Sequence, residues 1–109
     1  MPRETLGDFE VMVLLAAMRL GEKAYGLSIA EEISSTARRA TGRASVYVAL
    51  RRLEKKALIS TRWEDPGEAA SGKPRRFITV RPEAVTLLGE SRRALHRMWS
   101  GLERELEEA

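Results

Sequence analysis

The 109-residue sequence contains no cysteine and only one histidine. Without cysteine the chain offers neither a disulfide nor a thiolate, which favours a reducing, cytoplasmic compartment. His96 alone cannot supply the imidazole ligands of a zinc site, so we expect no metal and no other cofactor. The same shortage leaves no nucleophile–base pair, and no glycine-rich phosphate loop follows a predicted strand. The sequence therefore predicts a protein that is not an enzyme.

Long hydrophobic runs are also lacking. The apolar stretch at residues 11–18 has eight residues, well short of the ~20 needed to span a bilayer. It follows Glu4, Asp8 and Glu10, where an export signal would carry positive charge. We therefore expect neither export nor contact with a membrane. A chain of this length is expected to form one compact domain with an appended helix.

The net charge is only +3, but it is distributed unevenly. Residues 38–76 carry 11 of the 19 basic side chains and 4 of the 16 acidic ones, which leaves both flanking segments acidic. Such a concentration of positive charge predicts a polyanionic partner on one face of the protein. The alternative that stays open is an ordinary solvated surface.

Apolar periodicity predicts three helices in the first half of the chain. The first, about residues 6–20, carries two apolar stripes, so it needs cover on two sides, which we attribute to a second chain. Gly21 is expected to end this helix in the left-handed conformation. A second helix is expected at residues 26–36. Thr41 is the expected cap of a third, amphipathic helix that ends near Ala57 and has a basic polar face.

The second half of the chain predicts a hairpin and a last helix. Residues 58–63 and 76–80 have strand composition, and the turn-rich segment 64–75 forms the tip between them. From Pro82 we expect a helix of about two dozen residues, ~36 Å long, with Leu88, Leu95 and Leu102 seven residues apart. The predicted fold class is mainly α with a small β-hairpin. It comprises a winged helix-turn-helix DNA-binding domain at residues 1–81 and a C-terminal dimerisation helix at residues 82–109.

In this layout the helix after the break enters the major groove of DNA. Residues near its N-terminus are predicted to contact bases, with Tyr47 also within reach of phosphates: Arg43, Ser45, Tyr47 and Val48. The predicted phosphate contacts lie farther along the helix and in the hairpin tip: Arg51, Arg52, Lys55, Lys73, Arg75 and Arg76. The open alternatives are that these basic side chains only keep the surface soluble and that Tyr47 caps the core.

Five segments carry a family resemblance: residues 6–10 (LGDFE), 25–29 (YGLSI), 45–59 (SVYVALRRLEKKALI), 71–77 (SGKPRRF) and 82–84 (PEA). They resemble the PadR family of bacterial transcriptional regulators, in a short form with a single C-terminal helix. The resemblance implies a homodimeric winged-helix repressor of double-stranded DNA, whose C-terminal helix packs against the partner subunit. Such a dimer is expected to bind an operator with two half-sites.

The resemblance also implies an interface and an effector site. The predicted dimer interface consists of Leu6, Phe9, Leu88, Leu95, Met98, Trp99 and Leu102. Trp99 is the candidate contact for an aromatic small-molecule effector, because some family members stack such molecules on tryptophan; packing of the interface alone is the open alternative. In the family, glycine usually stands at the positions of Ala44 and Ala57. Alanine in place of glycine at position 57 predicts a different turn into the hairpin. A winged-helix adaptor that binds proteins instead of DNA remains the alternative function.

Overall fold

Three helices form the body of the protein. In the computed structural model, which describes residues 5–69 and 72–108, helices α1 (Asp8–Leu20), α2 (Gly26–Thr36) and α3 (Arg43–Lys55) pack around one apolar core. A short 3-10 turn, η1 (Gly21–Lys23), joins α1 to α2. Ser71, which belongs to the motif at residues 71–77, lies outside the described residues. So do residues 1 and 109, the outer bounds of the two predicted domains.

The core draws on all three helices. Val13 and Leu14 of α1, Ile29 of α2, and Val46 and Leu53 of α3 are the largest side chains that are completely buried. Their burial removes apolar surface from water, at about 25 cal/mol for each Å², and this holds the helices together. The apolar spacing of each helix therefore determines which of its faces points inward, and the polar faces are left outside.

Local signals determine where α1 begins and ends. Gly7 is its N-cap, and Glu10 accepts a hydrogen bond from the Gly7 N–H at 2.7 Å. Gly21 follows the last residue with φ 59° and ψ −124°. This conformation is not the left-handed helical one that we expected, but its positive φ equally favours glycine.

The turn between α2 and α3 differs from the prediction at its cap. Gly42, not Thr41, is the N-cap of α3. The Thr41 N–H instead donates to Ser34 Oγ at 3.1 Å, and the Thr41 hydroxyl donates to the Arg39 carbonyl at 2.8 Å. Thr41 is thus engaged in holding the turn against α2, so its side chain does not reach the first N–H groups of α3.

A two-stranded antiparallel hairpin follows α3. Strands β1 (Ile59–Trp63) and β2 (Arg76–Val80) pair from Ile59–Val80 at the base to Trp63–Arg76 near the tip. The loop between them contains a 3-10 turn, η2 (Pro66–Glu68). The other edge of β2 is joined to the body, because Tyr25 forms a bridge with Phe77 and the Ile78 N–H donates to the Ala24 carbonyl at 2.8 Å. The residues 59–80 are called the wing below.

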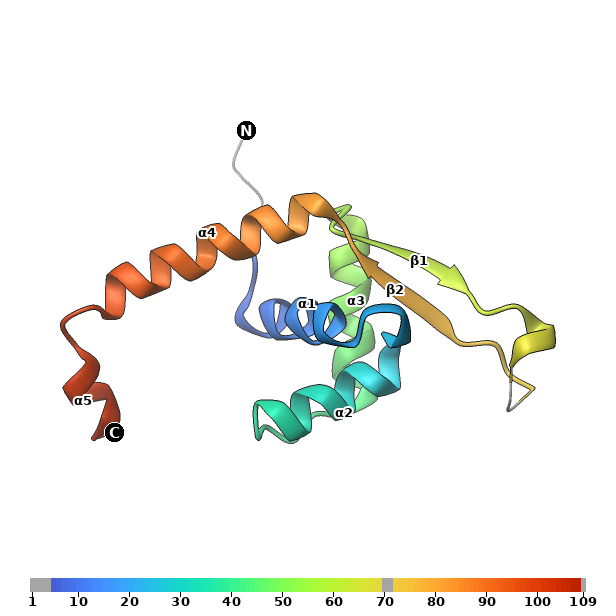
Figure 1. Ribbon diagram of the computed structural model, residues 1–109, viewed down its shortest axis with the longest axis horizontal. Coiled ribbons are helices and arrows are strands. Elements are labelled where there is room, and N and C mark those ends of the chain that lie inside the picture. Colours follow the sequence, from blue (N-terminus) through green and yellow to red (C-terminus); the bar gives the residue numbers. More distant parts are fainter. Residues whose placement is uncertain (1–4, 70–71, 109) are drawn as a thin grey trace.

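The C-terminal segment extends from the body on the side opposite to the wing (Figure 1). Helix α4 (Pro82–Trp99) starts at proline as predicted, but only Ala84 and Leu88 of this helix are buried. The predicted continuous helix is wrong, because α4 stops at Trp99 and a separate short helix, α5 (Glu103–Glu107), follows. Gly101, with φ 91°, turns the chain between them, so Leu102 does not continue the heptad of α4.

Candidate nucleic-acid interface

Helix α3 presents a basic face to the solvent. Its buried side is formed by Val46, Ala49, Leu50 and Leu53. Every predicted contact on this helix lies on the exposed side: Arg43, Ser45, Tyr47, Val48, Arg51, Arg52 and Lys55. Its N-cap, Gly42, has no side chain that could cap the first turn. The first N–H groups and the positive end of the helix dipole are therefore accessible to an anionic partner.

The ring of Tyr47 is partly packed against the protein and partly exposed to the solvent. The side chain is half-exposed, at 50%. Its ring lies so close to Gly26, the first residue of α2, that a Cβ there would stand 2.6 Å from Tyr47 Cε1. The packing resembles the core-capping role considered from the sequence, while the exposed half still faces the side of α3 that carries the cations.

Arg75 is held by contacts within the wing. Its guanidinium donates to Glu64 Oε1 at 3.1 Å and to Oε2 at 2.8 Å, and its centre lies 5.0 Å from the ring of Tyr25 and 5.3 Å from that of Phe77. Glu64 is buried. The hydrogen bonds from Arg75 hold the pKa of the Glu64 carboxyl below its ordinary value, against the opposing effect of desolvation. Sequence reasoning missed Glu64 altogether.

Arg76 links the wing to α3. It donates to Glu54 Oε2 at 2.7 Å, and its guanidinium lies 5.8 Å from the ring centroid of Trp63. Trp63 stands opposite Arg76 in the strand register and is 66% exposed. The sequence analysis placed Trp63 in a strand without assigning it a role, although its alternation with Ile59 and Thr61 indicated the strand face on which it lies.

A concave surface of about 740 Å³ lies between α3 and the wing. It gathers aromatic and basic side chains from both: Tyr25, Gly26, Leu27, Arg43, Tyr47, Trp63, Lys73, Pro74, Arg75 and Arg76. The structure thus brings two of the four predicted base contacts of α3, Arg43 and Tyr47, together with the predicted wing contacts on one surface. The predicted phosphate contacts of α3, Arg51, Arg52 and Lys55, lie outside this lining. Ser45, Val48 and Arg52 border another hollow against the start of α1.

A partly buried ion pair connects α3 to α1. Lys56, the C-cap of α3, donates to both carboxylate oxygens of Glu10 at 3.0 Å and to the Thr5 carbonyl at 2.9 Å. Glu10 is only 7% exposed and also caps α1. Sequence reasoning missed this pair. It ties the end of α3 to the start of α1 with charge-assisted hydrogen bonds, which constrains the orientation of α3.

The predicted interface residues fall into three groups. Leu88 is buried in the core of its own chain, so it has almost no apolar surface to offer a partner. Leu6 and Phe9 are partly buried against the same core. The remaining residues are exposed: Leu95, Met98, Trp99 and Leu102. Trp99 is 43% exposed and stands edge-on to His96, with ring centroids 6.5 Å apart.

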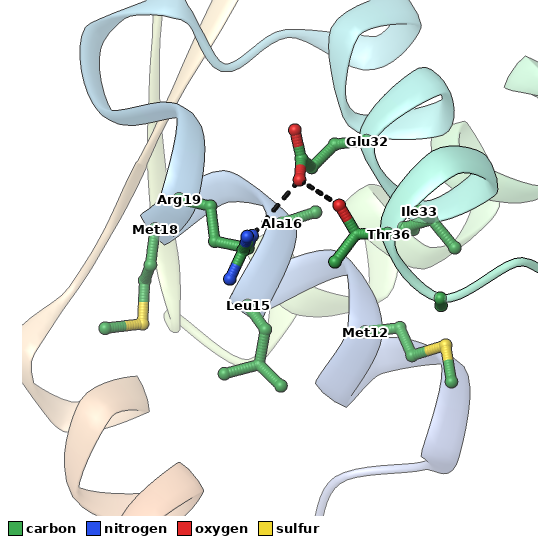
Figure 2. Close-up of a pocket in the computed structure, with 9 residues that line it drawn as sticks. Met12, Leu15, Ala16, Met18, Arg19, Glu32, Ile33 and Thr36 are labelled. Carbon is green, nitrogen blue, oxygen red and sulfur yellow. Dashed lines mark hydrogen bonds and ion pairs between the residues drawn. The ribbon is translucent and has the colours of Figure 1, made fainter.

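An apolar groove of about 480 Å³ lies between α1 and α2. Figure 2 shows Met12, Leu15 and Met18 of α1 along it, with an ion pair between Arg19 and Glu32 at one side. Leu15 and Met18 are 45% and 46% exposed. Two residues of the second apolar stripe of α1, Leu15 and Met18, are thus left open on the chain by itself, whereas Leu14 of the same stripe is completely buried in the core.

The described residues contain no group of three or more histidine, aspartate or glutamate side chains placed to hold a metal ion. Among the helices in the described ranges, none is both long and apolar enough to cross a bilayer.

Comparisons with known proteins agree with this arrangement. The family model of the transcriptional regulator PadR-like family matches residues 14–82. A PadR family transcriptional regulator from Eggerthella lenta DSM 2243 has 25% identity and a TM-score of 0.70, over 91% of this chain and 84% of the other. A transcriptional regulator from Clostridium thermocellum has 16% identity and a TM-score of 0.71, over 87% and 89%.

A PadR family transcription regulator from Clostridium difficile R20291 has 20% identity and a TM-score of 0.65, over 94% of this chain and 97% of the other. No curated protein sequence matches the chain. The predicted fold class is confirmed, since the mainly helical body, the hairpin and the C-terminal helix match these winged-helix structures. With a family model that spans more than half of the sequence, this chain belongs to the PadR-like family of transcriptional regulators.

Proposed function

We propose that this protein is a repressor that binds a two-half-site operator as a homodimer. Membership of the family makes DNA-binding regulation of transcription the general function. The proposal adds that α3 enters the major groove while the wing meets the adjacent minor groove. The observation that carries it is the concave surface between α3 and the wing, to which both elements contribute cations.

The positions on α3 support a division between base and phosphate contacts. Arg43, Ser45, Tyr47 and Val48 lie in the first two turns, where a recognition helix approaches the floor of the groove. Arg43 is suited to guanine, because its planar fork matches the O6 and N7 acceptors. The phosphate contacts are then Arg51, Arg52 and Lys55 on the helix, with Lys73 and Arg76 on the wing.

Arg75 has a different role in this proposal. Its guanidinium is engaged by both oxygens of the buried Glu64 and by two aromatic rings. An arginine held in this way keeps its charge near the DNA but has fewer donors for a phosphate. We therefore assign Arg75 mainly to positioning of the wing, with a long-range electrostatic contribution to DNA affinity.

Two unpartnered apolar surfaces support the homodimer. One is the groove between α1 and α2, along which Leu15 and Met18 are exposed. The other is the end of α4, where Leu95, Met98 and Trp99 are exposed. Contiguous apolar surface of this kind marks an interaction site. In a twofold dimer the α4 of each copy occupies the groove of the other, so that both surfaces are covered reciprocally.

This proposal assigns DNA binding to residues 1–81, whose groove between α1 and α2 also receives the partner's α4, and dimerisation to residues 82–109. The first two turns of α4 pack onto the winged-helix body through Ala84 and Leu88, which attaches the start of this helix to the body. A dimer on both half-sites blocks access of other proteins to the same DNA, which favours repression. An aromatic effector that stacks on Trp99 at the dimer interface would change the half-site spacing and release the operator.

The test is a binding titration of DNA from upstream of the gene against random DNA of equal length. The expected result is a sequence preference at ~150 mM salt and a log–log salt slope of about −0.9 for each phosphate contacted. Sedimentation of the same sample should give a dimer. A chain without any sequence preference under these conditions contradicts the regulator and favours the protein-binding adaptor.

A further inference from the structure

One face of strand β1 runs from the core into the solvent. Ile59, Thr61 and Trp63 lie on the same face because side chains alternate along a strand. Ile59 is 3% exposed, Thr61 is partly buried, and Trp63 is 66% exposed. Ile59 and Thr61 border a hollow whose other wall is formed by α3. The face that packs against α3 at its base therefore continues outward, and at Trp63 it is largely uncovered.

The ring of Trp63 is held on one side. The Arg76 guanidinium lies 5.8 Å from its centroid, and Arg76 is itself fixed by the 2.7 Å hydrogen bond to Glu54 of α3. A cation near the face of an indole is attracted by the negative charge of the ring, which restrains the side chain. Trp63 is 66% exposed, so it presents a restrained ring with most of its surface open to a further contact.

The surroundings of Trp63 favour a polyanion. The concave surface to which it belongs is lined by Arg43 from α3 and by Lys73, Arg75 and Arg76 from the wing. Arg75 and Arg76 already pair with Glu64 and Glu54, but the four cations outnumber these two carboxylates. An apolar protein surface laid there would therefore bury net positive charge, which is unfavourable. A DNA backbone suits this surface in two ways. Its phosphates are attracted by the net positive charge, and its deoxyribose rings offer apolar surface to the indole.

We propose that Trp63 is a DNA contact, packing its free face on a deoxyribose of the strand that passes between α3 and the wing. The inference rests on the proposed function and adds a residue to its binding surface. Insertion between bases is not expected, because an intercalating side chain needs two free faces and Arg76 lies against one of them. Since every nucleotide carries a deoxyribose, this contact adds affinity and contributes little to sequence preference.

The test compares wild-type protein with Trp63→Ala, Trp63→Phe and Ser60→Ala in DNA titrations at several salt concentrations. Trp63→Ala is expected to weaken binding about tenfold, as for an aromatic residue at a well-packed contact. Trp63→Phe should lose less, because a ring is retained. Ser60→Ala is the matched control, since Ser60 is exposed on the other face of the same strand. The salt slope should stay the same, because the lost contact is uncharged.

Fluorescence provides a second measurement. The chain has two tryptophans, so Trp63→Phe leaves Trp99 as the only one. Addition of the operator should change the emission of wild-type protein, and most of this change should be missing in Trp63→Phe. Circular dichroism of each variant establishes that it is folded.

Three outcomes overturn the inference. One is an unchanged affinity of Trp63→Ala, and another is an emission change of equal size in wild-type protein and Trp63→Phe. The third is a salt slope of Trp63→Ala reduced by about one phosphate, which would mean that Trp63 acts only by positioning Arg76. Failure of wild-type protein to bind DNA instead contradicts the proposed function, and the inference falls with it.

Discussion

The ring of Tyr47 lies against the backbone of Gly26, where a Cβ would stand 2.6 Å from Tyr47 Cε1. The contact joins the recognition helix α3 to the first residue of α2, so any residue larger than glycine must displace one of the two helices or the ring. The sequence motif at residues 25–29 and that at residues 45–59 thus meet in space, and the glycine of the first makes room for the tyrosine of the second.

We expect Gly26→Ala to lower the free energy of unfolding by about 1–3 kcal/mol, because it overpacks this contact. It should also weaken DNA binding, since Tyr47 moves. Urea denaturation and DNA titration measure the two effects. In a Tyr47→Ala background the stability cost of Gly26→Ala should largely disappear. Gly89→Ala is the control, because the atoms nearest its new Cβ belong to the flexible end of Arg93; an equal loss there would refute the explanation.

Ala57→Gly should stabilise the protein by about 1 kcal/mol, because Ala57 has φ 58°, a conformation that glycine adopts without strain. Thermal denaturation measures the change, and DNA affinity should stay constant. Ala44→Gly, in the exposed first turn of α3, is the matched control and should instead destabilise by about 1 kcal/mol. A lower melting temperature for Ala57→Gly would contradict the left-handed turn.

Glu64→Gln should destabilise the wing at neutral pH and remove part of the acid sensitivity of the fold. The pKa of Glu64 is held below its ordinary value of 4.5 by Arg75, so its stabilising contribution is complete above that pH and is lost as the pH falls through the lowered pKa. The melting temperatures of wild type and Glu64→Gln should therefore converge below pH 4.5. Glu32, whose pKa is also lowered, is common to both proteins and cancels in the comparison.

Glu68→Gln serves as the control for this experiment, because it removes the same charge from an exposed position in the wing. Its melting temperature should follow that of wild type at every pH. If Glu64→Gln behaved like Glu68→Gln, the ion pair with Arg75 would have no role in holding the wing.

Arg43→Ala and Arg51→Ala should separate base contacts from phosphate contacts. Arg43→Ala is expected to cost about 1–3 kcal/mol on the operator and much less on random DNA, which relaxes the sequence preference. Arg51→Ala should weaken both DNAs alike and reduce the salt slope by about 1. Competition titrations with operator and random duplexes measure both quantities. Equal losses on both duplexes for both variants would show that the assignment is wrong.

Leu95→Asp should convert the proposed dimer to a monomer and weaken binding to a two-half-site operator, because it places a charge in the apolar surface of α4. Sedimentation equilibrium and DNA titration measure the change. Leu106→Asp is the matched control. Leu106 is similarly exposed but belongs to α5, beyond the bend at Gly101, so this variant should remain dimeric. A dimeric Leu95→Asp protein would contradict the proposed interface.

The turn at the end of α3 differs from the one predicted from the family resemblance. Alanine in place of the usual glycine predicted a different turn, and this prediction was wrong. The Leu58 N–H donates to the Leu53 carbonyl and the Ala57 N–H to the Glu54 carbonyl, both at 3.0 Å, which is the pattern of a glycine-type helix end. Burial of Leu53 and Leu58 holds the turn, so the packing imposes on alanine a conformation that its side chain disfavours.

At the end of α4, local helix propensity decided the structure instead of packing. The heptad of Leu88, Leu95 and Leu102 predicted one continuous helix, while Ser100 and Gly101 carried the local signal for its end. Glycine and serine are poor helix formers, and in this exposed segment no packing against the chain's own core compensates for their low propensity. The break therefore falls where propensity places it.

The sequence by itself determined the type and order of the helices and strands up to α4. The bounds predicted for α2 and β2, the start of α4 at Pro82 and the basic face of α3 all agree with the structure, because they depend on the spacing of neighbouring residues. Tertiary structure decided which cations are held by acidic partners and which aromatic ring stays open. The pairing of Glu10 with Lys56, 46 residues apart, and the position of Arg76 over the ring of Trp63 depend on how the elements pack, and short-range periodicity does not contain this information.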